Sequence, residues 1–202
     1  MENKTLTLLD HAIIFATKAH SGTTRKGTNV PYIVHPIEAA AIVSAMTDDE
    51  EVIAAAVLHD VIEDTEATRE DLLARFGRRI TDLVMNESED KRRNLPAALT
   101  WKTRKQETIT FLETEADTDA KMLALADKLA NLRAIHRDQC IIGDKIWERF
   151  NEKDKNMHAW MYRSIAKALE ELKDHPTWQE YNRLVDEVFG KEKDLDKPDK
   201  KG

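Results

Sequence analysis

The chain has 202 residues, of which 41% are apolar and 34% charged, and its net charge is −7. This composition is typical of globular proteins, and the acidic balance argues against a general nucleic-acid binder, because a phosphate backbone needs a basic surface. The single cysteine, Cys140, excludes an internal disulfide framework and a cysteine-rich zinc module. We find neither a signal-peptide core after Met1 nor an apolar run near the ~20 residues of a membrane helix. We therefore expect a cytoplasmic protein that binds neither nucleic acid nor membranes.

Helical spacing of apolar residues dominates the chain, and five prolines and six glycines are too few for an all-β protein. The sequence predicts an all-α fold. The predicted elements in chain order are a helix over 5–20, a loop over 21–34, a helix with Pro36 in its first turn that runs to about 46, a helix capped by Asp48, a helix between the Thr68–Asp71 capping box and Gly77, and helices over 78–86, 122–135, 141–172 (broken near Asn151) and 178–189. We place one domain at 1–190 and a charged, disordered tail at 191–202.

The segment between Lys91 and Lys105 carries basic residues and no acidic one. Like charges crowded into a small protein repel one another, so this segment is predicted to face water or an anion.

Three places put metal-type ligands at or within apolar helices. His35 precedes Pro36, His59-Asp60 closes the apolar run that ends at Leu58, and Asp127 lies among leucines and alanines. Burying an unpaired carboxylate costs several kcal/mol, so a buried Asp127 needs a cation or a strong donor. Two imidazoles and two carboxylates suit Mn²⁺, Fe²⁺, Zn²⁺ or Co²⁺, and the ligand set does not choose among them.

Glu63 and Asp64 follow His59 and Asp60 by one helical turn. A divalent metal lowers the pKa of a water that it binds, and a neighbouring carboxylate can orient that water or move its proton. The two carboxylates are therefore candidate catalytic groups.

Each element also has a simpler explanation when it is taken alone. His35 can be a capping residue, Asp127 can pair with Lys128 or Arg133, and Glu63-Asp64 can be a solvated helix end. His20 is read as a surface residue, with support of a metal ligand as the alternative. The joint pattern favours the metal site, because every element lies at an apolar helix.

Four blocks in this order resemble the hydrolase domain of the RelA/SpoT homologues, within the HD phosphohydrolase superfamily. They are AHSG with RKG at 19–27, PYIVHP at 31–36, LHDVIEDT at 58–65 and LADKLANLR at 125–133. The resemblance covers roughly residues 5–175, and the chain has the length of a stand-alone small alarmone hydrolase. It departs from longer relatives at Ala130 and Ala134 and in the segment 92–102.

The resemblance implies an HD-domain helical bundle that holds one Mn²⁺ through His35, His59, Asp60 and Asp127. It implies hydrolysis of the 3′-pyrophosphate of ppGpp and pppGpp to GDP or GTP and pyrophosphate, with Glu63 and Asp64 as catalytic acids. The residues that it places at the substrate are Arg25, Lys26, Lys91, Arg104, Lys105, Asn131 and an aromatic residue, Tyr162 or Trp160.

Two other functions stay open on the sequence. One is a broader phosphohydrolase that acts on adenosine alarmones or on another nucleotide with a 2′ or 3′ phosphate. The other is a non-catalytic nucleotide-binding scaffold, which the full set of ligands and acids disfavours. The oligomeric state is open, and a homo-oligomer is compatible with the sequence.

Overall fold

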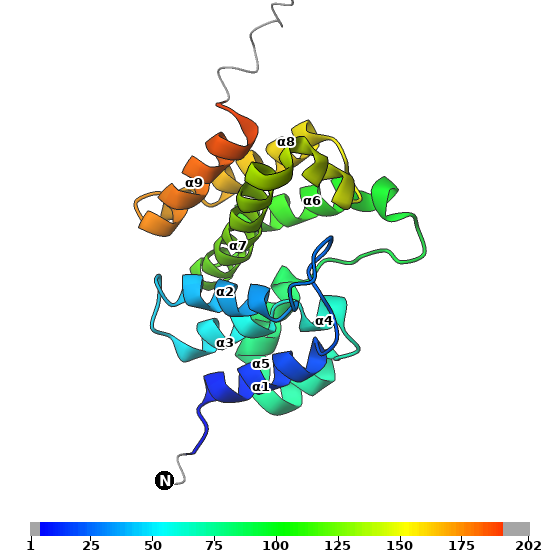
Figure 1. Cartoon of the computed structure of the whole chain (residues 1–202). Coiled ribbons are helices and arrows are strands. Elements are labelled where there is room, and N and C mark those ends of the chain that lie inside the picture. Colours follow the sequence, from blue (N-terminus) through cyan, green and yellow to red (C-terminus); the bar gives the residue numbers. More distant parts are fainter. Residues whose placement is uncertain (1–4, 192–202) are drawn as a thin grey trace, which may run out of the picture.

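The computed structural model describes residues 5–191, and all regular structure in this range is helical, as predicted (Figure 1). Residues 192–202 of the predicted tail lie outside the described residues. The elements are α1 (Leu8–Ala19), α2 (Val34–Val43), α3 (Glu50–Leu58), α4 (Val61–Asp64), α5 (Arg69–Glu87), α6 (Ala97–Thr114), α7 (Thr118–Ile142), the 3-10 helix η1 (Gly143–Arg149), α8 (Lys155–Ala168), the 3-10 helix η2 (Glu170–Leu172) and α9 (Pro176–Phe189). None of the helices in the described part of the chain is long and apolar enough to cross a membrane.

Helix α7 is the central element, since it packs on α2, α3 and α5 of one half and on α9 and η1 of the other (Figure 1). Its residues 122–127 are all buried, which explains why its sequence shows no single apolar face. Asp117 caps its amino end by accepting a hydrogen bond from the Ala120 amide at 2.8 Å. The central position of α7 places Asp127 deep inside the molecule.

Helices α2 and α3 pack on each other and on α7. One predicted boundary is wrong here, because Asp49, not Asp48, caps α3. Pro36 lies in the first turn of α2, as predicted, since that helix begins at Val34; it ends at Val43, three residues earlier than expected. Small residues at 54–56 lie fully buried, so α3 approaches its neighbours closely, and it ends at His59 as the carboxyl cap.

The predicted capping box at the start of α5 is confirmed, with reciprocal hydrogen bonds between Thr68 and Asp71. Gly77 interrupts the helix as predicted, with a φ of +78° and a ψ of 177°, a conformation that is accessible essentially to glycine. The helix resumes at Arg78, so α5 is two helices joined at a kink.

The loop between α1 and α2 closes on itself through an antiparallel bridge between Thr24 and Pro31. Gly27 lies at its tip with a φ of +72°, and a Cβ added there would stand 2.6 Å from Cδ of Arg149. Glycine at this position therefore meets both a backbone and a packing requirement. The loop carries Arg25 and Tyr32 toward the start of α2.

The carboxyl-terminal half is broken near Asn151, as predicted, because η1 ends at Arg149 and α8 starts at Lys155. Trp101 and Trp147 are buried there against His158 and complete an aromatic core between α6, η1 and α8. Through Trp101 this core anchors the amino-terminal part of α6.

Candidate active site

Three buried side chains from three helices converge at one point: His35 of α2, His59 at the end of α3 and Asp127 of α7. The Nε2 atoms of the two histidines are 3.2 Å apart. Oδ1 of Asp127 lies 3.0 Å from Nε2 of His35 and 3.5 Å from Nε2 of His59. The predicted convergence of these three residues, which are up to 92 positions apart in the chain, is therefore confirmed.

The His59 ring is oriented as a metal ligand would be. Its Nδ1 lies 2.8 Å from the carbonyl oxygen of Ala56, and a carbonyl only accepts hydrogen bonds. Nδ1 therefore carries a hydrogen, so Nε2, which faces His35 and Asp127, is the nitrogen that can bind a cation when the ring is neutral.

Asp60 lies beside this group, since its Oδ2 is 3.0 Å from Nε2 of His59 and 3.4 Å from Nε2 of His35. Ligand atoms about 2.1 Å from a cation are about 3.0 Å apart at a right angle and about 3.4 Å apart at the tetrahedral angle. The nitrogen–oxygen and nitrogen–nitrogen separations run from 3.0 to 3.5 Å, close to this range, for the His35, His59 and Asp127 group and for Asp60 beside it. The donor set and its spacing therefore fit a divalent cation.

The site is electrostatically prepared for positive charge. Burial opposes the charged form of Asp60, but His59 and His35 outweigh it and hold the pKa of Asp60 well below its ordinary value. For Asp127 burial is outweighed chiefly by Lys128, and its pKa is also held well below the ordinary value. Both carboxylates are therefore ionised at neutral pH.

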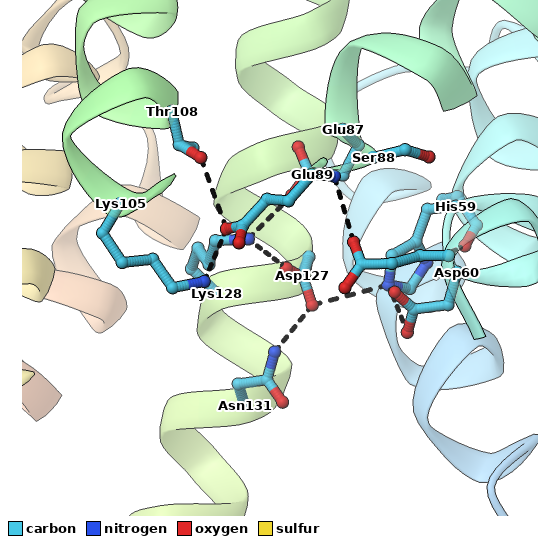
Figure 2. Close-up of polar contacts among 12 residues, drawn as sticks. His59, Asp60, Glu87, Ser88, Glu89, Lys105, Thr108, Asp127, Lys128 and Asn131 are labelled. Atoms are coloured by element: carbon cyan, nitrogen blue, oxygen red, sulfur yellow. Dashed lines mark hydrogen bonds and ion pairs between the residues drawn. The ribbon is translucent and has the colours of Figure 1, made fainter. Parts of the chain in front are cut away.

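Two polar side chains of α7, Asn131 and Lys128, contact the Asp127 carboxylate and fix its orientation (Figure 2). Asn131, one turn along α7, donates from Nδ2 to Oδ1 of Asp127 at 2.7 Å. Lys128 contacts the other carboxylate oxygen and also donates to Oε1 of Glu87 at 2.7 Å. The Glu87 and Lys128 side chains are 8% and 11% exposed, so this is an interior ion pair that the sequence did not reveal.

The predicted catalytic carboxylates lie next to the metal-type ligands. The Asp64 amide donates to the carbonyl of Asp60 at 2.9 Å, so the two residues are one turn apart around α4. Lys91 Nζ lies 3.1 Å from Oε1 of Glu63 and also contacts Asp64. Burial, with a further contribution from the charge of Asp60, raises the pKa of the Glu63 carboxyl.

A cavity of about 260 Å³ opens beside these carboxylates. Four of the predicted substrate-binding cations line it, together with Glu63, two aromatic rings, Ala97 and Asn151. The cations are Lys26, Lys91, Arg104 and Lys105, and the rings belong to Trp101 and Phe150. The cavity thus joins cationic groups from three parts of the chain to the edge of the candidate metal site.

Acidic side chains from outside the 91–105 segment pair with several of its cations, so part of the segment faces protein carboxylates, while residues 93–99 are exposed. Glu89 accepts hydrogen bonds from Arg104 at 2.6 Å and from Lys105 at 2.5 Å (Figure 2 shows the second). Lys91 pairs with Glu63 and Asp64, and Arg92 pairs with Glu107. Folding brings these acids to cations that are 15 to 28 residues away.

The ion pairs of Glu89 with Arg104 and Lys105 lead to a prediction about stability. Replacing Glu89 by glutamine leaves Arg104, which is 8% exposed, without its anion, and we expect a loss of about 3 kcal/mol of unfolding free energy at pH 7. Burial opposes the Glu89 charge, but Lys105 and its other cationic neighbours hold its pKa below the ordinary value of 4.5. The stabilisation is therefore complete above pH 4.5 and is lost as the pH falls through the lower folded-state pKa.

Urea unfolding of wild type and Glu89→Gln across pH measures this difference. Glu66→Gln, an exposed change, is the control and should cost less than about 0.5 kcal/mol. If the difference in unfolding free energy between wild type and Glu89→Gln increased on acidification, this result would contradict the assigned direction of the pKa shift.

Of the remaining predicted site residues, Arg25 and Asn131 lie at the site, whereas the aromatic candidate Tyr162 does not. Arg25 donates to Oδ1 of Asn131 at 2.6 Å, so these two residues lie together next to Asp127. Tyr162 is 3% exposed and packs on Tyr181 and Phe189, so the structure places it in the core, away from open solvent. Trp160, the alternative aromatic, is half-buried with Lys102 over its ring.

Two residues near the site were missed or misjudged. His20 is buried, not a surface residue, and stacks on Tyr32 with ring centroids 4.7 Å apart. The Tyr32 hydroxyl contacts both Asp60 and Asp64. For Tyr32 the sequence gave only a weak signal of a place at the site, namely its position three residues before His35.

Comparison with known proteins agrees with this arrangement. A family model described as HD domain matches residues 12–147, more than half of the chain. The chain is 37% identical over 130 residues to a GTP pyrophosphokinase rsh of Brucella ovis. The matched residues make up 63% of this chain but only 17% of that protein's length.

Two shorter relatives match over more of their own length. Guanosine-3′,5′-bis(diphosphate) 3′-pyrophosphohydrolase MESH1 of Danio rerio is 37% identical over 138 residues, 67% of this chain and 72% of that protein. The solved structure of a metazoan orthologue of SpoT, described as hydrolysing ppGpp, superposes with a TM-score of 0.68 at 26% identity, over 93% of this chain and 96% of that one. The chain therefore belongs to the HD-domain family and is related there to the hydrolase domain of the RelA/SpoT homologues.

Proposed function

We propose that this protein is a manganese-dependent 3′-pyrophosphohydrolase of ppGpp and pppGpp. The observation that carries the proposal is a buried His35, His59 and Asp127 group with three further carboxylates, of Asp60, Glu63 and Asp64, and a cation-lined cavity nearby. Its relatives include a protein named for this activity, over most of that protein's length.

In this proposal His35, His59, Asp60 and Asp127 hold one Mn²⁺. The metal supplies Lewis-acid chemistry when bound, which polarises a phosphoryl oxygen and lowers the pKa of a coordinated water. Nitrogen and carboxylate donors suit Mn²⁺ and also Fe²⁺, Zn²⁺ and Co²⁺, so metal identity is part of the test below.

Glu63 and Asp64 move the protons of the reaction. A water oxygen bonds to the phosphorus attached to the ribose 3′ oxygen, the bond from that phosphorus to the 3′ oxygen breaks, and pyrophosphate leaves. Asp64 accepts a proton from the attacking water, and the half-buried Glu63, whose pKa is raised by its surroundings, delivers a proton to the departing 3′ oxygen.

The cations of the cavity bind the phosphates in this proposal. Lys91 spans the two catalytic carboxylates, and Lys26, Arg104 and Lys105 line the same space. Arginine binds phosphate oxygens in a bidentate manner, and lysine acts as a point charge. Arg25 and Asn131 lie next to Asp127 and are assigned to the nucleoside, as the family resemblance implies.

Product identity tests the proposal. The protein is incubated with Mn²⁺ and either ppGpp or its adenosine counterpart, and products are separated by anion-exchange chromatography. We expect GDP and pyrophosphate from ppGpp, and reconstitution with Zn²⁺, Fe²⁺ or Co²⁺ ranks the metals.

Three other outcomes would contradict parts of this assignment. Cleavage of the adenosine substrate alone would favour the broader phosphohydrolase. Release of orthophosphate would place the broken bond elsewhere. Absence of turnover with every metal would favour a non-catalytic nucleotide-binding scaffold.

A further inference from the structure

The hydroxyl of Tyr32 lies between a metal-type ligand and a proposed catalytic group. Its Oη is 2.7 Å from Oδ2 of Asp60 and 2.9 Å from Oδ2 of Asp64. Both separations are those of ordinary hydrogen bonds between oxygens. Among residues 5–191, no other side chain donates hydrogen bonds to both of these carboxylates.

The ring of Tyr32 is held on several sides. His20 stacks on it with ring centroids 4.7 Å apart, and the His35 ring lies nearly perpendicular to it with ring centroids 6.0 Å apart. The guanidinium of Arg25 lies 5.5 Å from the ring centroid. The backbone is also anchored, because the Tyr32 amide donates to the carbonyl of Thr23 at 3.0 Å. The hydroxyl therefore has little freedom to leave the two carboxylates.

One phenolic proton serves two acceptors here, so the position of the hydroxyl depends on both carboxylates and in turn restrains both. A phenol is a neutral hydrogen-bond donor at physiological pH, so it can bind both carboxylates. A bridging donor of this kind transmits the orientation of one carboxylate to the other.

We propose that Tyr32 is a positioning residue that sets the placement of Asp64 relative to the metal ligand Asp60. The inference rests on the proposed function for the role of Asp64. Tyr32 touches neither a metal nor a reacting atom in this assignment and acts through the two aspartates. Groups that orient metal ligands typically contribute 10- to 100-fold in metal affinity or activity.

The test is Tyr32→Phe, which keeps the stacked ring and removes only the hydroxyl. Tyr181→Phe is the matched control, because the buried Tyr181 hydroxyl donates to the carbonyl of Tyr162 at 2.9 Å, and its removal perturbs stability without touching the site. Both variants are compared with wild type by Mn²⁺ calorimetry, thermal melting and steady-state kinetics at saturating Mn²⁺.

We expect Tyr32→Phe to weaken Mn²⁺ binding about tenfold and to lower kcat by a further 10- to 100-fold at saturating metal, with KM changed less than about threefold. Tyr181→Phe should lower the melting temperature and leave Mn²⁺ affinity and kcat unchanged. On an Asp64→Asn background, Tyr32→Phe should have little additional effect on kcat, since the two groups act as a unit.

Unchanged Mn²⁺ affinity together with unchanged kcat in Tyr32→Phe would overturn the inference. So would a loss of kcat that is equally large with and without Asp64, because the hydroxyl would then act independently of that carboxylate. The calorimetric comparison needs no substrate. If wild type binds Mn²⁺ and cleaves no alarmone, the proposed function fails, while the link from Tyr32 to the metal ligand is still judged by metal affinity.

Discussion

Replacing Asp127 by asparagine is expected to abolish divalent-metal binding and to lower kcat/KM for alarmone hydrolysis by about a thousandfold or more. The reason is the loss of the anionic ligand that faces both histidine nitrogens at 3.0 Å and 3.5 Å. Asparagine keeps the shape and one acceptor oxygen, and Lys128 keeps Glu87 as its anion, so the fold should survive.

Metal-dependent thermal stabilisation separates binding from catalysis in this variant. A metal that binds only the folded state stabilises it by about 2.7 kcal/mol at a concentration of 100 times its Kd. Wild type should show this increase on addition of Mn²⁺, and Asp127→Asn should not. Asp138→Asn, on the same helix but paired with Arg149, should retain both the stabilisation and the turnover.

An Asp127→Asn protein that retained wild-type metal stoichiometry would contradict the assigned ligand set.

Replacing Asp64 by asparagine should leave metal binding nearly intact and reduce kcat by 10²- to 10⁴-fold, the usual range for a general acid or base. Asp64 contributes no atom to the His35, His59 and Asp127 group, and its contacts are to Tyr32 and Lys91. Single-turnover kinetics at saturating Mn²⁺ measure the chemical step directly. Calorimetry with Mn²⁺ measures the retained affinity.

Glu66→Gln provides the matched control for this change, because it removes one negative charge from an exposed position two residues further along. Near-normal turnover in Asp64→Asn would remove Asp64 from the mechanism. Loss of metal in Asp64→Asn would make the carboxylate a ligand instead of a proton carrier.

Much of the local structure follows from short-range chemistry. The Thr68–Asp71 capping box and the break at Gly77 were predicted because each depends on backbone groups within a few residues. The boundaries of α2 and α3 were less predictable. Asp48 and Asp49 are chemically equivalent candidates, and only the path of the preceding turn selects Asp49.

Ion pairs around the cavity show what local patterns miss. Arg104 and Lys105 read as free cations because no acid lies between residues 91 and 105, yet the turn after α5 brings Glu89 to both. Lys91 likewise meets Glu63 and Asp64 across 27 and 28 residues. Charge patterning along the chain identified the cations but could not show which of them are already paired.

The sequence by itself determined the all-helical class and pointed to His35, His59 and Asp127, because polar groups inside apolar helices are costly and must be compensated. Only the tertiary structure decided how they are compensated. The crossing of α7 over α2 and α3 sets the 3.0–3.5 Å spacing between Asp127 and the two histidines. The fold of the loop before α2 places one hydroxyl, on Tyr32, between Asp60 and Asp64. Such spacings depend on packing between elements distant in the chain, and no local pattern encodes them.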